Sequence, residues 1–173
     1  MSRLATMSPA ALKSLFAPET DDDLIMLLTI YDPSNPTTVS MRLCDGYTSR
    51  ISETLDDVIY GTTSRGNNYI FLPIEVSLPS EDDANAPKCS LVLHDVTQMI
   101  VPTIRSLTGP PKVLLELVLA STPDTVEASF YGFYISNISY DANSINAELS
   151  MVDYQVEPFP AFSITPAYFP GLF

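Results

Sequence analysis

The sequence predicts a mainly β protein: a barrel or sandwich of about six or seven strands, with one packed α-helix and a short N-terminal helix. Short apolar or alternating segments recur along the chain, separated by clusters of proline, glycine, aspartate and asparagine. Only two segments have helical spacing. Hydrophobic residues make up 46% of the 173 residues and charged residues 17%, which is typical of one globular domain.

Residues 1–22 are expected to form a short helix and a linker. Ser8 is placed to cap a helix, Pro9 suits its first turn, and Pro18 ends it. Three apolar residues between these signals share one face at helical spacing: Leu12, Leu15 and Phe16. The pattern predicts an amphipathic helix over residues 9–17.

Residues 23–157 are predicted to form the β domain. The expected strands lie in "DLIMLLTIYD", "TTVSMRLCD", "YIFLPIEVSLP", "KCSLVLHDV", "KVLLELVLAS", "VEASFYGFYISNISY" and "SINAELSMVDYQVEP". Pro73 interrupts the third of them, which indicates an edge or a bulge. The polar segment 47–68 is interpreted as a loop. The main helix is expected in "DVTQMIVPTIRSLTGPP", where Pro102 predicts a kink, and residues 141–143 are expected to turn between the last two strands.

The chain closes on "EPFPAFSITPAYFPGLF", residues 157–173. Four prolines exclude a helix interior and a central strand, yet the segment is rich in aromatic residues. Exposed aromatic residues mark contact sites, so residues 158–173 are interpreted as a docking arm. Its candidate interface residues are Phe159, Phe162, Ile164, Tyr168, Phe169, Leu172 and Phe173. Whether the arm covers its own sheet or a neighbouring subunit stays open.

The sequence offers little for catalysis. His94 is the only histidine, which excludes a histidine-based metal cluster and leaves one base for any catalytic triad. Glu53, Asp56 and Asp57 are close in sequence but show no acid–base pairing. Glu116, inside an apolar strand, is expected to face solvent because its neighbours face the other way. We therefore expect no enzyme activity, no metal and no cofactor.

Net charge limits the classes of binding partner, and the cysteine pattern indicates the redox state. The net charge of −13 disfavours specific nucleic-acid binding and anionic membranes. No secretory signal or membrane span is visible. Cys44 and Cys89 are expected to be reduced thiols in the core, with a single disulfide as the alternative.

Aromatic residues also gather in "FYGFYISNISY". Strand alternation places Tyr131 and Phe133 on one face, with Gly132 between them leaving room for close approach. These two residues are a second candidate interface. An exposed aromatic face would also suit a carbohydrate, which remains an alternative.

The segments 23–46, 69–107 and 112–151, with the ending "FPGLF", resemble a family of small tail proteins of long-tailed, non-contractile double-stranded DNA phages. The resemblance implies a tube- or hub-like β-barrel in the tail tip or baseplate, made in the host cytoplasm and incorporated into the virion tail. It implies a trimeric or hexameric ring that contacts the tail tube, the distal tail ring and the central hub, with DNA only passing through. Some related tip proteins hold an iron–sulfur cluster on several cysteines. Two cysteines do not fit that pattern, so no cluster is expected.

Two other roles stay open at this point. A head-to-tail connector or tail-terminator protein would share the acidic character and the ring assembly. A carbohydrate-binding receptor module would use the aromatic residues near Tyr131.

Overall fold

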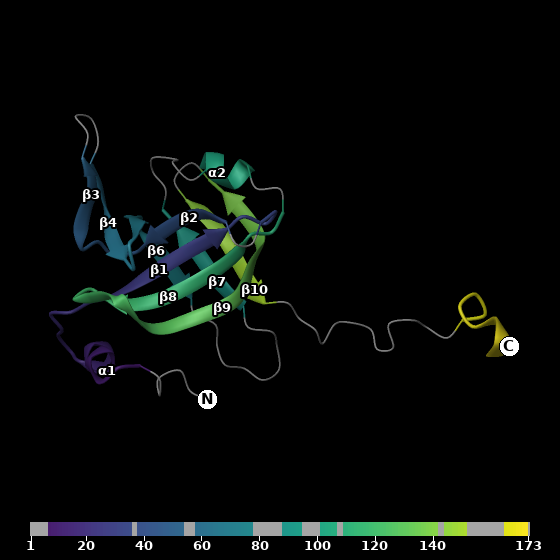
Figure 1. Cartoon of the computed structure of the whole chain (residues 1–173), viewed down its shortest axis with the longest axis horizontal. Helices are drawn as coiled ribbons and strands as arrows, with labels where there is room; N and C mark the ends of the chain where they lie inside the picture. The colour runs from purple at the N-terminus through teal and green to yellow at the C-terminus, as the bar shows by residue number, and fades with distance from the viewer. Residues whose placement is uncertain are drawn as a thin grey trace.

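A computed structural model describes most of the chain, and Figure 1 shows its elements. The described residues are 7–35, 38–53, 58–77, 88–94, 101–106, 109–141, 144–151 and 165–172. Three helical segments are present in this part: α1 (Pro9–Phe16), α2 (Val101–Ser106) and the 3₁₀ helix η3 (Pro170–Leu172). The strands are β1 (Leu24–Tyr31), β2 (Val39–Cys44), β3 (Ser49–Glu53), β4 (Val58–Ser64), β5 (Asn67–Phe71), β6 (Ile74–Ser77), β7 (Lys88–Leu93), β8 (Lys112–Leu119), β9 (Thr122–Tyr140) and β10 (Ile145–Met151).

The mainly β prediction is confirmed, but the strand number and the closure differ. The described residues form one sheet of ten strands in the order β3-β4-β5-β2-β1-β8-β9-β10-β7-β6. Strands β3 and β6 form its two edges, so the sheet is open rather than a closed barrel. Neighbours pair antiparallel except β2 and β5, whose parallel pairing is confined to Leu43 with Ile70 and Cys44 with Phe71.

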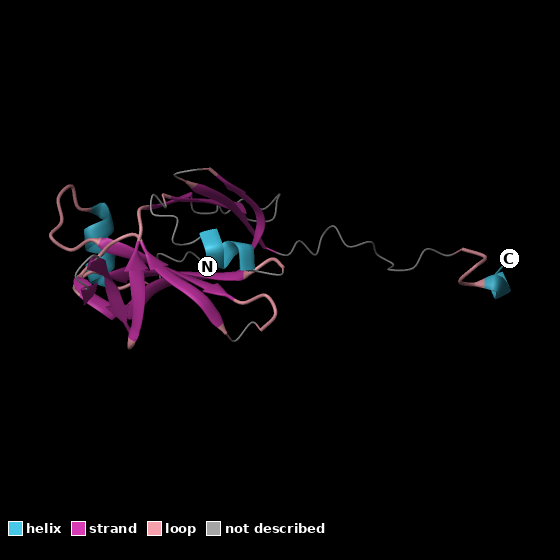
Figure 2. Ribbon diagram, turned by 90° about the horizontal axis from the view of Figure 1, so that it is seen from above, coloured by secondary structure: helices cyan, strands magenta, loops and turns pink. Residues whose placement is uncertain are grey.

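The main hydrophobic core lies on one face of the sheet, and the sheet bends around it (Figure 2). Leu28 of β1 and Leu91 of β7 belong to the same buried cluster, although three strands separate β1 from β7 in the sheet order. Phe133 of β9 and Leu149 of β10 fill the space between them, with 1% and 0% of their surface exposed. Such strong bending is a way to cover the apolar faces of many strands without a second sheet.

A second, smaller cluster lies on the opposite face of β1. It contains Ile25, Leu27, Cys44, Tyr69 and Val118. Side chains of β1 therefore reach a core on both faces, and six consecutive residues of that strand are buried. This explains why "LIMLLTIY" is continuously apolar instead of alternating.

The segment predicted as a loop, residues 47–68, instead contains β3, β4 and the start of β5. It is polar because four of the five residues of edge strand β3 are exposed. Arg65 and Gly66 form the turn between β4 and β5 with φ angles of 50° and 74°. Two successive residues with positive φ are typical of the type I′ hairpin turn.

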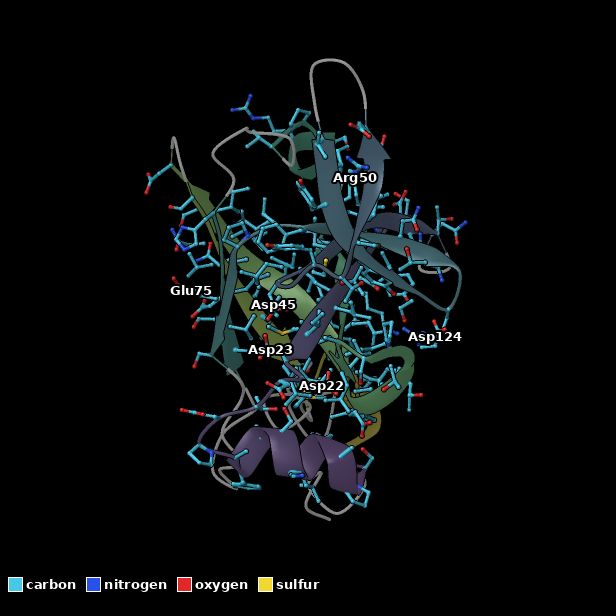
Figure 3. All side chains as sticks on the ribbon, turned by 90° about the vertical axis from the view of Figure 1, so that its left-hand side faces the viewer. Asp22, Asp23, Asp45, Arg50, Glu75 and Asp124 are labelled. Atoms are coloured by element: carbon cyan, nitrogen blue, oxygen red, sulfur yellow. The ribbon has the colours of Figure 1, made fainter. Side chains whose placement is uncertain are left out.

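Helix α1 begins at Pro9 as the sequence predicts and ends at Phe16, one residue before the predicted end. Ser8 Oγ accepts a hydrogen bond from the Ala11 N–H at 3.1 Å, and Pro9 is in the first turn. The carboxylate of Glu127 accepts hydrogen bonds from the Ser8 N–H at 2.8 Å and the Ser8 hydroxyl at 2.9 Å. Asp22 connects the helix to the sheet, since its carbonyl accepts from the Ser14 hydroxyl and its carboxylate from Ser121 (Figure 3).

The apolar face predicted for α1 is only partly covered. Leu12 is half-buried, while 48% of Leu15 and 71% of Phe16 are exposed. Ala11 is the buried residue of this helix instead.

Helix α2 covers six residues of the predicted main helix. Val101 packs against the main core, so this helix lies on the sheet as expected. Residues 95–100, 107 and 108 of the prediction lie outside the described residues.

Candidate functional site

The predicted docking arm is described only at its end. Tyr168 and Phe169 both donate their backbone N–H to the carbonyl of Thr165, at 3.0 and 2.9 Å, which forms a turn ahead of η3. Their side chains are 66% and 41% exposed. Figures 1 and 2 show this turn apart from the sheet. The two rings are therefore not covered by the described part of the sheet.

Of the other five predicted interface residues of the arm, one lies in the described part of the chain. Leu172 lies in η3. Phe159, Phe162, Ile164 and Phe173 lie outside the described residues.

Tyr131 and Phe133 do not share a face, so the alternation expected for this strand is wrong at that point. Val113 of β8 pairs with Phe133, and Leu115 pairs with Phe130, so β9 carries an extra residue between these pairs. Gly132 accommodates this bulge with a φ of 85°. Tyr131 is 62% exposed and Phe133 1% exposed, which leaves only Tyr131 accessible to a partner.

An aromatic cluster that the sequence analysis missed lies beside β3 and β4. The Tyr47 ring centroid lies 5.4 Å from that of Tyr60 and 5.2 Å from that of Phe71. Tyr47 is 60% and Tyr60 47% exposed, so the cluster is open to solvent. These residues are far apart in sequence and meet only through strand pairing. No local pattern could have revealed them.

Glu116 does not face solvent, contrary to the expectation from alternation. Its side chain is 5% exposed and forms an ion pair with Arg65 of the β4–β5 turn. The alternation itself holds, but the β4–β5 hairpin covers this face of β8. The same turn is held by Asp124, which accepts from the Arg65 N–H at 2.5 Å, and by the Ser64 hydroxyl, which donates to the Pro123 carbonyl at 2.7 Å. The Glu116 carboxylate also raises the pKa of Arg65 above its usual range.

The remaining ionisable candidates do not form a reactive centre. His94 Nε2 lies 3.1 Å from Glu75 Oε1 in an exposed pair. Glu53 pairs with Arg50 on the projecting β3–β4 hairpin (Figure 3), and Asp56 and Asp57 lie outside the described residues. Nowhere in the described ranges do three or more His, Cys, Asp or Glu side chains gather as a metal ion would require.

The two cysteines are free and buried, as predicted. Burial raises the pKa of the Cys44 thiol and of the Cys89 thiol to about 11. Such thiols are protonated at neutral pH, and the thiol is a poor nucleophile.

Comparison with known proteins places the chain in a family. Residues 10–164 match the model of a domain of unknown function, DUF1833. The chain belongs to the DUF1833 family. No curated protein matches it.

The DUF1833 match begins inside α1 and spans the whole described sheet. It ends at residue 164, just before the turn that carries Tyr168 and Phe169. Within the described part of this DUF1833 chain, none of the helices combines the length and apolar character needed to cross a membrane.

Proposed function

We propose that this DUF1833 chain is a structural, non-enzymatic subunit of a phage tail tip or baseplate ring, joining the tail tube to the central hub. The observation that carries the proposal is the exposure of Tyr168 and Phe169 on a turn apart from the sheet. Aromatic residues placed in this way bind in pockets of a neighbouring subunit, and nearby prolines reduce the ordering cost. The sequence resemblance to small phage tail proteins supports a location in a phage tail.

The open sheet supports assembly as well. Strands β3 and β6 each have one edge without a partner strand in the described sheet. Such edges accept strands from other chains. In this proposal, the tube- or hub-like barrel of the resembling family is completed by neighbouring subunits of a trimeric or hexameric ring. The net charge of −13 suits a channel through which DNA slides without binding.

The experiment compares the full chain with a variant lacking residues 158–173, using light scattering and negative-stain microscopy. We expect a ring for the full chain, and for the variant a folded monomer with an unchanged circular dichroism spectrum. A double substitution of Tyr168→Ser and Phe169→Ser should weaken assembly similarly. Phe16→Ser is the matched control, because Phe16 on α1 is an aromatic residue that is even more exposed than Tyr168 and Phe169. Normal rings without residues 158–173, or an unfolded truncated chain, would contradict the proposal.

A head-to-tail connector or tail-terminator ring is the second candidate, supported by the same acidic charge and exposed turn. Immunogold labelling of intact particles separates the two, since the proposed subunit belongs at the distal end of the tail.

A carbohydrate-binding module has weaker support, because Phe133 is buried and leaves Tyr131 as the exposed ring of that pair.

A further inference from the structure

A polar cavity of about 200 Å³ lies on the face of β1 that the β4–β5 hairpin covers. Its lining comes from β1, β2, β5, β8 and the β4–β5 turn. Three of the lining polar side chains are at least nine-tenths buried: Thr29, Tyr69 and Glu116 are 3%, 3% and 4% exposed. The Tyr69 hydroxyl lies 3.4 Å from Thr29 Oγ1. The cavity is therefore part of the fold, with polar groups fixed in its walls.

The charges in the wall do not balance. Arg65 and Glu116 neutralise each other through two hydrogen bonds, at 2.9 and 2.5 Å. Arg42, which also lines the cavity, forms no ion pair with any residue in the described part of the chain. The cavity thus carries one net positive charge in a chain whose net charge is −13. A half-buried cation without a counter-charge is costly, and an incoming anion would compensate it.

From this geometry we infer that the cavity binds a single carboxylate group, with Arg42 as the residue that receives it. The planar fork of an arginine matches the two oxygens of a carboxylate. Tyr31 and Asn67 supply further donors from the lining. A phosphate dianion is disfavoured, because the single net positive charge of the wall compensates only one of its two negative charges.

Two sources could supply the carboxylate: a free small carboxylic acid, or an acidic side chain of a second copy of this chain. The inference does not depend on the proposed tail function, because it rests on the cavity and its charges alone. A failure of the ring proposal would leave it standing.

The test uses the full chain and observes the arginine side-chain signals by NMR during titration with acetate and, separately, inorganic phosphate. We expect saturable shifts with acetate, weaker effects with phosphate, and acetate binding about tenfold or more weaker in Arg42→Gln. Arg50→Gln is the control, because Arg50 lies on exposed edge strand β3 and should not affect binding. Arg42→Lys keeps the charge but loses the fork, so it should retain part of the affinity and serves as the test if Arg42→Gln does not fold.

Light scattering on the same samples shows whether the carboxylate comes from a second copy of the chain or from a free acid. If acetate and Arg42→Gln both lower the molar mass, the carboxylate comes from a second copy. If acetate binds through Arg42 and the mass is unchanged, it comes from a free acid. Equal acetate binding by wild type and Arg42→Gln, or no acetate binding with an unchanged mass in the variant, would overturn the inference.

Discussion

The guanidinium of Arg65 binds the carboxylate of Glu116 through two hydrogen bonds, from Nη1 to Oε1 and from Nη2 to Oε2. The two residues are 51 positions apart, one in the β4–β5 turn and one in the middle of β8. The pair therefore holds the hairpin onto the sheet. Its two members differ in exposure, since the Arg65 side chain is 40% and that of Glu116 5% exposed.

Because of this difference in exposure, we expect that removing Arg65 lowers the free energy of unfolding more than removing the charge of Glu116. Arg65→Ala leaves a buried carboxylate without its counter-charge, and should lower the free energy of unfolding by about 3 kcal/mol or more. Glu116→Gln leaves an arginine that can still reach water, so it should cost less. Urea denaturation measures both. Arg50→Ala is the control, because both side chains of the Arg50–Glu53 pair are more than half exposed and its loss should cost less than about 1 kcal/mol. Equal effects of Arg65→Ala and Arg50→Ala would show that the buried pair is not a clamp.

Gly61 in β4 should not accept a side chain. A Cβ built there would lie 1.9 Å from the carbonyl oxygen of Tyr69 and 2.5 Å from Ile51 Cδ1. We expect Gly61→Ala to destabilise the protein by about 3 kcal/mol, because the neighbouring strand must shift. The midpoint of thermal unfolding measures the effect. Gly171→Ala, with nothing within 4 Å of its Cβ, should leave the midpoint unchanged; a similar loss in both variants would refute the steric explanation.

The link between α1 and the sheet can be tested at Ser8. Ser8→Ala removes the cap on the Ala11 N–H and one of the two hydrogen bonds to Glu127, and should cost about 1–2 kcal/mol. Hydrogen exchange of the α1 amides should accelerate in this variant. Ser8→Thr keeps the hydroxyl and should restore protection. Ser8→Asp can cap the helix but places a second carboxylate beside Glu127, so rescue by aspartate would argue that Glu127 plays no part.

The buried thiols predict a loss of stability at high pH. Burial raises the pKa of both Cys44 and Cys89 from the usual 9.0 to about 11 in the folded protein. Between pH 9 and 11 the unfolded chain releases these protons while the folded chain retains them, so the free energy of unfolding falls as the pH rises. The upper limit is about 1.4 kcal/mol per pH unit for each thiol. Urea denaturation at pH 8 and pH 10.5 should show a steeper fall for wild type than for the Cys44→Ala/Cys89→Ala variant, and parallel falls would exclude the thiols as the cause.

Local signals were sufficient for several features of the fold. Ser8, Pro9 and Pro18 predict the limits of α1, because capping and proline geometry act within one helical turn. Pro73 predicts the break between β5 and β6 for the same kind of reason.

Features that depend on distant residues could not be predicted in this way. The burial of Glu116 depends on a hairpin that the polar sequence 47–68 did not reveal, because an exposed edge strand lacks an apolar face. Tyr47, Tyr60 and Phe71 become neighbours only once the strands pair. Tyr168 and Phe169 are exposed, and the interpretation of their segment as a docking arm stays a prediction.

Because of the bulge at Gly132, the fold constrains the number of residues in β9 as well as the kinds of residues that the strand contains. The residues from Phe133 to Ile135, which follow the bulge, face the side opposite to the one that simple counting from Phe130 assigns. A second extra residue between Ile135 and Asn137 restores the count, so Ile138 packs against the main core again. Deleting one residue here would turn Ile135 outward and bring Tyr134 toward the core. Relatives of this chain should therefore vary in which residues occupy the bulge far more readily than in how many.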